Sequence, residues 1–363
     1  MMVSVISILV SFALSLSMVA FILRLAHKRS WYDQVNERKI HSGDIPRLGG
    51  IGFASAYIII SLFTIFFDHD FSPGLRFLGP IAGLVIVLIL GVIDDFSPLS
   101  SMAKLPIQGI SALLVILPGY TFARPFFIES GWLRSLEWTR YPLTFIWIMG
   151  MINAMNFIDG IDGLSAGIST IIALSYAALF VFLLDTGPGA IFCLYLAAVL
   201  LGFLVFNAPF PQAKIFMGDG GSQFLGFILA LLPLITQNPS QTPSLPMFYA
   251  GALVLIPVYD TVAAIWRRIR DHKPIDKPDK AHIHHKLMNL GLSAWGINGV
   301  LYGLQALLCG LVLAAVKIKG PLSLVLLLSA YLSCLIFFAI IHFLNRRVNK
   351  LSRESQKNAA GSP

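Results

Sequence analysis

The sequence predicts an all-α polytopic integral membrane protein, folded as one bundle of transmembrane helices. Of its 363 residues, 56% are hydrophobic and 12% are charged, and the mean hydropathy is +0.79. Soluble domains carry roughly 25% charged residues, so this composition excludes a soluble class. Apolar stretches of about 20 residues recur along the whole chain, each long enough to cross a bilayer as a helix.

We expect about 11 transmembrane helices. The first apolar stretch has no basic residues before it and no clear cleavage site, so we expect it to be retained as a helix. The polar segment 346–363 is expected to be a disordered tail, which leaves 1–345 as one transmembrane domain. The expected helices cover residues 2–23, 47–67, 76–93, 106–121, 141–157, 164–184, 190–206, 222–236, 246–266, 292–316 and 321–343.

The basic residues predict the orientation, because loops rich in Lys and Arg stay in the cytoplasm. Most of the 26 Lys and Arg residues lie in one set of alternate connectors and in the tail. The N-terminus is therefore expected outside and the C-terminus in the cytoplasm. The net charge of +8 is explained by a basic cytoplasmic face beside anionic bilayer lipid, so no nucleic-acid partner is expected. The opposite connectors hold only Arg76, Arg124, Arg134, Arg140, Lys317 and Lys319.

The cysteines give no sign of a disulfide or a metal site. Cys193, Cys309 and Cys334 all lie inside apolar runs and have no paired spacing. We expect them to be small residues of the core.

Four polar clusters fall at the expected cytoplasmic ends of helices. A carboxylate near hydrocarbon is costly, so such residues are functional candidates. Their gathering on one face predicts an active site at the cytoplasmic membrane face. The clusters are "GVIDDFSPLSSMAK" with Asp94, Asp95 and Lys104, "NAMNFIDGIDG" with Asn153, Asn156, Asp159 and Asp162, "FNAPFPQAKIFMGDGGS" with Asn207, Phe216 and Asp219, and "DKAHIHHK" with Asp279, His282, His284 and His285.

The adjacent carboxylates of Asp94 and Asp95 repel each other unless a cation lies nearby. Oxygen ligands of this kind suit Mg²⁺, or Mn²⁺, together with the phosphates of a substrate. The alternative is a solvated helix cap. Asp219 stands in a glycine-rich turn that opens a helix, which suits a phosphate, although Asp219 could instead be the N-cap of that helix.

The histidine cluster and Asp260 each leave more than one interpretation open. Histidines bind zinc, but they also suit a phosphate-bearing substrate, general acid–base work or a structural interface. Asp260 lies inside the ninth expected helix near its cytoplasmic end. It is either a functional carboxylate or a structural partner of a basic group such as Arg267.

The motifs resemble those of a known family. "PRLGG", "GVIDDFSPLSSMAK", "NAMNFIDGIDGLSAG", "KIFMGDGGS" and "HIHHKL" occur in the order seen in polyprenyl-phosphate N-acetylhexosamine-1-phosphate transferases, the superfamily that contains MraY, WecA and TagO. The resemblance spans about residues 36 to 295. "HIHH" after a short basic loop and the early "KIHSGDIPRLGG" are closer to the WecA and TagO branch.

The resemblance implies that undecaprenyl phosphate attacks the β-phosphate of a UDP-N-acetylhexosamine, most of all UDP-GlcNAc, and releases UMP. It implies initiation of cell-envelope glycan synthesis in the bacterial inner membrane, and it is compatible with a homodimer. By motif, Asp219 would bind Mg²⁺, and Asp94 and Asp95 would bind the lipid phosphate and the metal. Asn156 and Asp159 would contact the nucleotide, with support from Asp162, and Phe216 would stack on uracil, with Asn207 and Asn153 on the substrate side. Lys104 would face a phosphate, and Arg47 would contact the substrate. The pyrophosphate or the sugar would be contacted by His282, His284 and His285.

Two other functions compete with this one. The same chemistry could use another donor, such as UDP-MurNAc-pentapeptide or a deoxy-N-acetylhexosamine. A cation- or proton-coupled transporter with a carboxylate relay is the alternative of another class. A transporter is expected to carry ionisable groups at mid-span, whereas these lie at helix ends.

Overall fold

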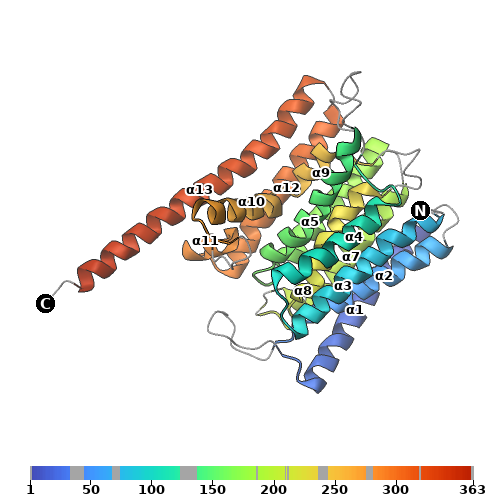
Figure 1. Ribbon diagram of the computed structural model, residues 1–363, viewed down its shortest axis with the longest axis horizontal. Coiled ribbons are helices and arrows are strands. Elements are labelled where there is room, and N and C mark those ends of the chain that lie inside the picture. Colours follow the sequence, from blue (N-terminus) through green and yellow to red (C-terminus); the bar gives the residue numbers. More distant parts are fainter. Residues whose placement is uncertain are drawn as a thin grey trace.

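The computed structural model describes an assembly of long helices (Figure 1). All secondary structure within the described ranges is helical. The structure describes residues 2–32, 45–67, 74–122, 137–184, 187–208, 210, 212–235, 244–274, 281–318 and 320–360.

Thirteen α-helices follow one another in the described part of the chain. A π-helical segment, Phe180–Leu184, extends α6, and 3₁₀ turns occur at Gly74–Phe77 and Leu232–Leu234. The α-helices are α1 (Met2–Arg29), α2 (Gly49–Phe67), α3 (Leu78–Phe96), α4 (Ser101–Ile116), α5 (Arg140–Ile158), α6 (Leu164–Leu179), α7 (Gly187–Asn207), α8 (Gly218–Leu231), α9 (Met247–Leu253), α10 (Leu255–Arg270), α11 (Ile283–Asn289), α12 (Ala294–Ile318) and α13 (Pro321–Ala360).

The chain is a polytopic helical membrane protein, and each of the expected spans overlaps a helix. Among the described residues, eight helices are long and apolar enough to cross a membrane, or nine if α9 and α10 form one bent span. Helix α4 and helix α8 are shorter, with 16 and 14 residues. The number of 11 crossings and the orientation therefore stay predictions.

The bend between α9 and α10 is 83° and has a clear cause. Pro257 lacks the backbone N–H that would bond to the carbonyl of Leu253, four residues earlier. Gln305 of α12 replaces that donor, since its Nε2 donates to the Leu253 oxygen at 2.8 Å. The broken helix thus keeps its polar backbone satisfied inside the bundle.

Helix α8 lies at the centre of the bundle, packed against α2, α3 and α5. Every residue of α8 except Asp219 is buried. Glycines allow this close packing: a Cβ on Gly50 would lie 2.2 Å from Gly221, and one on Gly91 would lie 2.5 Å from Gly220. Cys193, Cys309 and Cys334 are free and buried, as expected of small core residues.

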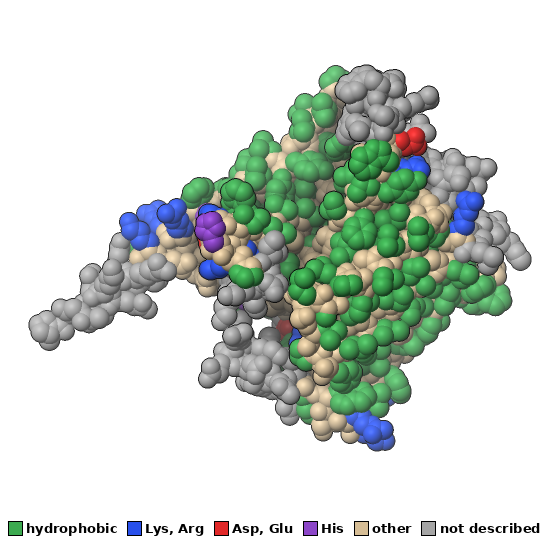
Figure 2. Space-filling model, in the orientation of Figure 1, with side chains coloured by type: hydrophobic (Ala, Val, Ile, Leu, Met, Phe, Trp, Pro, Cys, Tyr) green, Lys and Arg blue, Asp and Glu red, His purple; other side chains and the backbone are tan. Residues whose placement is uncertain are grey.

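The ends of six helices meet at one end of the bundle. The C-terminal ends of α3, α5 and α7 and the N-terminal ends of α2, α6 and α8 meet there, as their hydrogen bonds show. Hydrophobic side chains cover the flank of the bundle in Figure 2, and Lys and Arg gather at its ends and on the projecting part of α13. This distribution fits an apolar belt between two polar faces.

Helix α13 continues to Ala360 and does not end near residue 345. Its C-terminal part projects from the bundle beside α10 and α11 (Figure 1). The segment expected to be a disordered tail is therefore helical as far as Ala360. Its sequence, "RRVNKLSRESQKNAA", is rich in good helix formers and contains neither proline nor glycine before the end of the helix.

Candidate active site

Asp219 is the centre of the site. It stands in the first turn of α8, and its side chain is 25% exposed. Asn156, from the last turn of α5, donates through Nδ2 to Asp219 Oδ1 at 2.7 Å and to Ser222 Oγ at 2.9 Å. The Arg47 guanidinium lies 3.9 Å from Asp219 Oδ1. Two helices and the segment before α2 thus hold one accessible carboxylate.

Asp95 fixes the start of α8. Its Oδ1 accepts the backbone N–H of Asp219 at 2.7 Å, and its Oδ2 accepts that of Gly220 at 2.9 Å. A carboxylate there satisfies two free N–H groups and complements the positive end of the helix dipole. Asp219 is therefore not the N-cap of its own helix; Asp95 of α3 caps it.

Gly218 makes this turn possible. Its φ of +75° lies in the left-handed region, which favours glycine. A Cβ at this position would lie 2.0 Å from the Arg47 carbonyl oxygen and 2.7 Å from Asp95 Oδ2. We call Arg47, Asp95, Asn156 and Asp219 the α8 cradle.

The buried Asp94 and the half-buried Lys104 form an ion pair beside the cradle. Lys104 Nζ lies 2.6 Å from Asp94 Oδ2, and the Leu99 N–H donates to Asp94 Oδ1 at 2.7 Å. Asp94 also lies close enough to Asp219 for the two carboxylates to repel each other. The two adjacent aspartates therefore have different partners: Asp94 pairs with Lys104 of the same motif, and Asp95 caps α8.

Backbone hydrogen bonds align "PRLGG" with "KIFMGDGG". The Phe216 N–H donates to the Pro46 oxygen at 2.8 Å, and Gly49 N–H returns a bond to the Phe216 oxygen at 2.9 Å. This pairing places Arg47 over Asp219. Phe216 itself is half-buried, and its predicted stacking on uracil stays a prediction.

Two predicted residues hold the loop between α5 and α6. Asn207 accepts from Gly163 N–H at 3.0 Å and donates to the Ile215 oxygen at 2.9 Å. Asp162 Oδ2 accepts from Ala213 N–H at 3.3 Å. These contacts give Asn207 and Asp162 a positioning role, and their predicted roles toward substrate stay predictions.

Asn153 belongs to a buried chain of amides behind the site. Its Nδ2 donates to Gln108 Oε1 at 3.0 Å, and Gln108 Nε2 donates to Gln223 Oε1 at 3.0 Å. This chain joins α4, α5 and α8. Its geometry supports the cradle from behind, and the predicted substrate contact of Asn153 stays a prediction.

Asp159 lies in the loop after α5, among other charges. Desolvation raises the pKa of its carboxyl to about 8; Arg47 pulls the pKa down, and Asp219, Asp95 and Asp162 push it up. Several half-buried carboxylates that repel one another form an environment that favours a cation.

The oxygen donors of the site fit Mg²⁺. Among the described residues, no group of three or more His, Cys, Asp or Glu side chains is arranged to hold a metal alone, which also leaves zinc at the histidines without support. Mg²⁺ commonly uses one or two carboxylates and completes its shell with water and substrate phosphates. Asp219 is the accessible carboxylate of the three. Each oxygen of Asp94 and of Asp95 already accepts a hydrogen bond, so these two carboxylates would offer a metal only their remaining lone pairs.

Asp260 organises the start of α11, the helix that carries the histidines. Its Oδ2 lies 2.8 Å from His282 Nδ1, and its Oδ1 accepts the Ile283 N–H at 2.8 Å. Asp260 and His282 are both buried. These contacts favour the structural interpretation of Asp260, with His282 as a partner.

The histidines reach the loop after α5. The ring centres of His282 and His284 lie 5.9 Å apart with the rings parallel, and the ring centres of His284 and His285 lie 4.3 Å apart. A Cβ on Gly160 would lie 2.1 Å from His284 Nε2, so glycine allows the ring to pack there. Burial and the neighbouring His285 lower the pKa of His284 to about 3. His284 is thus a neutral ring next to "FIDGIDG".

Arg268 is a candidate that the sequence analysis missed. It is 5% exposed, and its guanidinium lies 5.4 Å from the centre of the Phe157 ring. Phe157 also contacts His282, with 5.4 Å between ring centres. Nε and Nη1 of Arg268 have no hydrogen-bond partner among the described atoms. Arg268 differs from Arg267 and Arg270 of the same basic run in being buried, and nothing in the sequence predicts that difference.

The fold and site define a class: a polytopic helical membrane protein with a carboxylate cradle and a histidine helix at one end. Residues 77–237 match the model of glycosyl transferase family 4. The chain belongs to that family, in the branch of polyprenyl-phosphate N-acetylglucosamine-1-phosphate transferases that the ordered motifs predicted.

Three relatives carry this assignment. The probable undecaprenyl-phosphate N-acetylglucosaminyl 1-phosphate transferase of Bacillus subtilis is 38% identical over 297 residues, 80% of this chain and 78% of that protein. The undecaprenyl-phosphate α-N-acetylglucosaminyl 1-phosphate transferase of Escherichia coli O157:H7 is 30% identical over 351 residues, 94% of this chain and 93% of its own. The decaprenyl-phosphate N-acetylglucosaminephosphotransferase of Mycolicibacterium smegmatis is 33% identical over 282 residues, 71% and 68% of the two chains.

Proposed function

We propose that the protein transfers GlcNAc-1-phosphate from UDP-GlcNAc to undecaprenyl phosphate and releases UMP. The observation that carries this proposal is the α8 cradle, in which one accessible carboxylate is fixed at a helix start between Arg47 and Asn156. A divalent cation on that carboxylate, with Arg47 beside it, would favour phosphate groups. The names of the Bacillus and Escherichia relatives support the acceptor and the sugar.

The reaction joins two anions, so it depends mainly on positioning and charge neutralisation. An oxygen of the lipid phosphate forms a bond to the β-phosphorus of the donor. The bond from that phosphorus to the oxygen bridging the α-phosphate breaks, and its electron pair leaves with UMP. A phosphate monoester is largely dianionic near neutral pH, so the attack does not require a base.

The chain offers a group for each task. Asp219, with Asp94, would hold Mg²⁺, or Mn²⁺, which supplies charge neutralisation at the phosphates. Arg47 faces the same carboxylate and is placed to meet a phosphate. Arg268 and neutral His284 would donate hydrogen bonds to the donor pyrophosphate or sugar from the other side of the α5–α6 loop.

The membrane location follows from the acceptor, which cannot leave the bilayer. The site residues occupy helix ends at one end of the bundle, and we place that end at the cytoplasmic face of a bacterial inner membrane. The described site carboxylates lie at or beside helix ends, which favours a transferase over a transporter with a mid-span relay.

The test is a donor panel. Purified protein in detergent receives undecaprenyl phosphate, Mg²⁺ and one of UDP-GlcNAc, UDP-MurNAc-pentapeptide or a UDP-deoxy-N-acetylhexosamine, and UMP and the lipid product are measured. We expect the highest kcat/KM with UDP-GlcNAc and no turnover with EDTA. Turnover only with another donor would overturn the choice of sugar, and an inactive but folded protein with all donors would overturn the reaction.

A further inference from the structure

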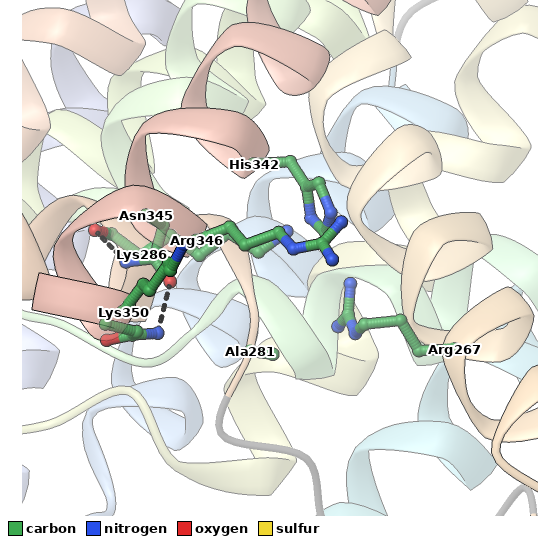
Figure 3. A pocket seen from close by; sticks show the side chains of 8 residues that line it. Arg267, Ala281, Lys286, His342, Asn345, Arg346 and Lys350 are labelled. Carbon is green, nitrogen blue, oxygen red and sulfur yellow. Dashed lines mark hydrogen bonds between the residues drawn. The ribbon is translucent and has the colours of Figure 1, made fainter. Parts of the chain in front are cut away.

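A cationic pocket lies between α10, α11 and α13, and its lining residues border the histidines of α11 without including them (Figure 3). Its volume is about 430 Å³. None of the described residues that line it is acidic, and none was predicted as a site residue. The lining residues are Arg267, Ala281, Lys286, His342, Asn345, Arg346, Asn349 and Lys350.

The charges of the pocket face one another. Figure 3 shows Arg267 of α10 and Arg346 of α13 pointing their guanidinium groups into the same space, next to His342. Lys286 of α11 lines the same pocket and is only 6% exposed. A cavity lined by several cationic side chains attracts anions, and phosphate oxygens form strong hydrogen bonds with Arg and Lys.

Hydrogen bonds between α11 and α13 and within α13 hold the wall of the pocket in place. Asn345 Nδ2 donates to the Lys286 carbonyl oxygen at 3.1 Å, and Asn349 Nδ2 donates to Asn345 Oδ1 at 3.2 Å. Asn345 is itself buried. These bonds tie α13 to α11 at the base of the pocket, so the cations are held around a defined space.

The surroundings indicate the depth of the pocket in the membrane. Trp266 and Ile269, next to Arg267 on α10, are 65% and 54% exposed, and Phe343 on α13 is 64% exposed. Apolar side chains that alternate with basic ones in this way mark the boundary between hydrocarbon and headgroups. Basic pockets between helices at that level bind lipid headgroups.

We propose that this pocket binds the phosphate headgroup of an anionic membrane phospholipid. The phosphate lies between Arg267, Lys286 and Arg346, and the acyl chains lie along the exposed apolar side chains of α10 and α13. The headgroup bridges three helices and stabilises the position of α11. A polyprenyl phosphate and a free phosphate share the anion chemistry, but the exposed apolar residues favour a lipid, and the lack of a catalytic carboxylate among the lining residues favours a phospholipid over the acceptor substrate.

The test compares two double variants that remove the same charge. Arg267→Gln with Arg346→Gln changes the pocket, whereas Arg270→Gln with Arg347→Gln changes neighbouring residues that do not line it. The full chain in detergent is titrated with phosphatidylglycerol, phosphatidylcholine, undecaprenyl phosphate or inorganic phosphate. Native mass spectrometry counts bound lipid, and the unfolding temperature reports stabilisation.

We expect the pocket variant to bind phosphatidylglycerol about tenfold more weakly or worse, since two charge-assisted bonds are lost. The control variant should stay within about twofold of the wild type. Lipid-free basal activity should be equal in all three proteins. If the pocket variant does not fold, Lys350→Gln against Arg347→Gln repeats the comparison at the exposed edge of α13.

Several results would overturn the proposal. Equal loss in both variants would mean diffuse charge attraction, and loss in neither would mean an empty pocket. Stabilisation by inorganic phosphate alone would make the ligand a free anion. Pocket-dependent binding of undecaprenyl phosphate but not of phosphatidylglycerol would make it the substrate lipid. Because binding is read without turnover, failure of the proposed reaction would leave this result intact.

Discussion

The α8 cradle and the histidine helix α11 are fastened to the bundle in different ways. Backbone hydrogen bonds and glycine contacts fix the cradle, and α2, α3 and α5 all pack against α8. The start of α11 depends on Asp260, and the same helix packs mainly on α13. One part of the site is therefore set by close backbone packing, and the other by single polar contacts.

The difference predicts how each part fails. Close packing is sensitive to added volume, because a methyl group has no room between two backbones. A polar contact is sensitive to the loss of a charge or a donor, because its buried partner is left unsatisfied. Variants of each kind can test whether the two parts of the site are really built differently.

The largest effect is expected for Asp219→Asn. The variant keeps the shape of the side chain but removes the one exposed charge of α8. UMP release should fall by about a thousandfold or more, because the metal and the phosphates lose their anchor. The unfolding temperature should change little, since the cap from Asp95 reaches the backbone of residue 219 and not its side chain. Near-normal turnover would show that Asp219 does not hold the metal.

Gly218→Ala should break the cradle by volume alone. Its Cβ would meet the Arg47 oxygen at 2.0 Å, and its φ of +75° is unfavourable for alanine. We expect a loss of roughly 1–3 kcal/mol in unfolding free energy, with activity falling alongside. Gly303→Ala in α12 is the matched control, because nothing lies within 4 Å of its added Cβ. Equal effects of the two changes on unfolding temperature would refute the packing argument.

Asp260→Asn should affect α11 and spare the cradle. Asparagine can still accept the Ile283 N–H, but it presents an amide to His282 Nδ1 in place of a carboxylate. We expect kcat to fall roughly tenfold to a hundredfold. The Mg²⁺ concentration for half-maximal activity should stay at the wild-type value. A large shift in that Mg²⁺ requirement would show that the two parts of the site are not independent.

The sequence predicted much of this arrangement, for identifiable reasons. Each long apolar run forms a helix. The polar motifs at helix ends meet at one end of the bundle, because short connectors keep the ends of successive helices close to each other. Asp95 as the cap of α8 was not predictable, because its partners lie more than a hundred residues away in sequence. Arg268 was missed for a similar reason: the ring that its guanidinium contacts, Phe157, lies on another helix more than a hundred residues earlier.

The smallest effect is a dependence of stability on pH that arises from His284. Burial lowers the pKa of His284 to about 3, whereas an unfolded histidine titrates near 6.5. Below about pH 6.5 the unfolded chain therefore binds a proton that the folded protein refuses, and stability falls as the pH falls. The loss approaches about 1.4 kcal/mol for each further pH unit down to the folded pKa. His284→Gln removes this proton, so its unfolding temperature should drop less than that of the wild type between pH 7.5 and pH 5. Parallel curves for the two proteins would show that His284 is charged or solvated in the folded state, and its proposed role as a neutral donor at the pyrophosphate would then fail with it.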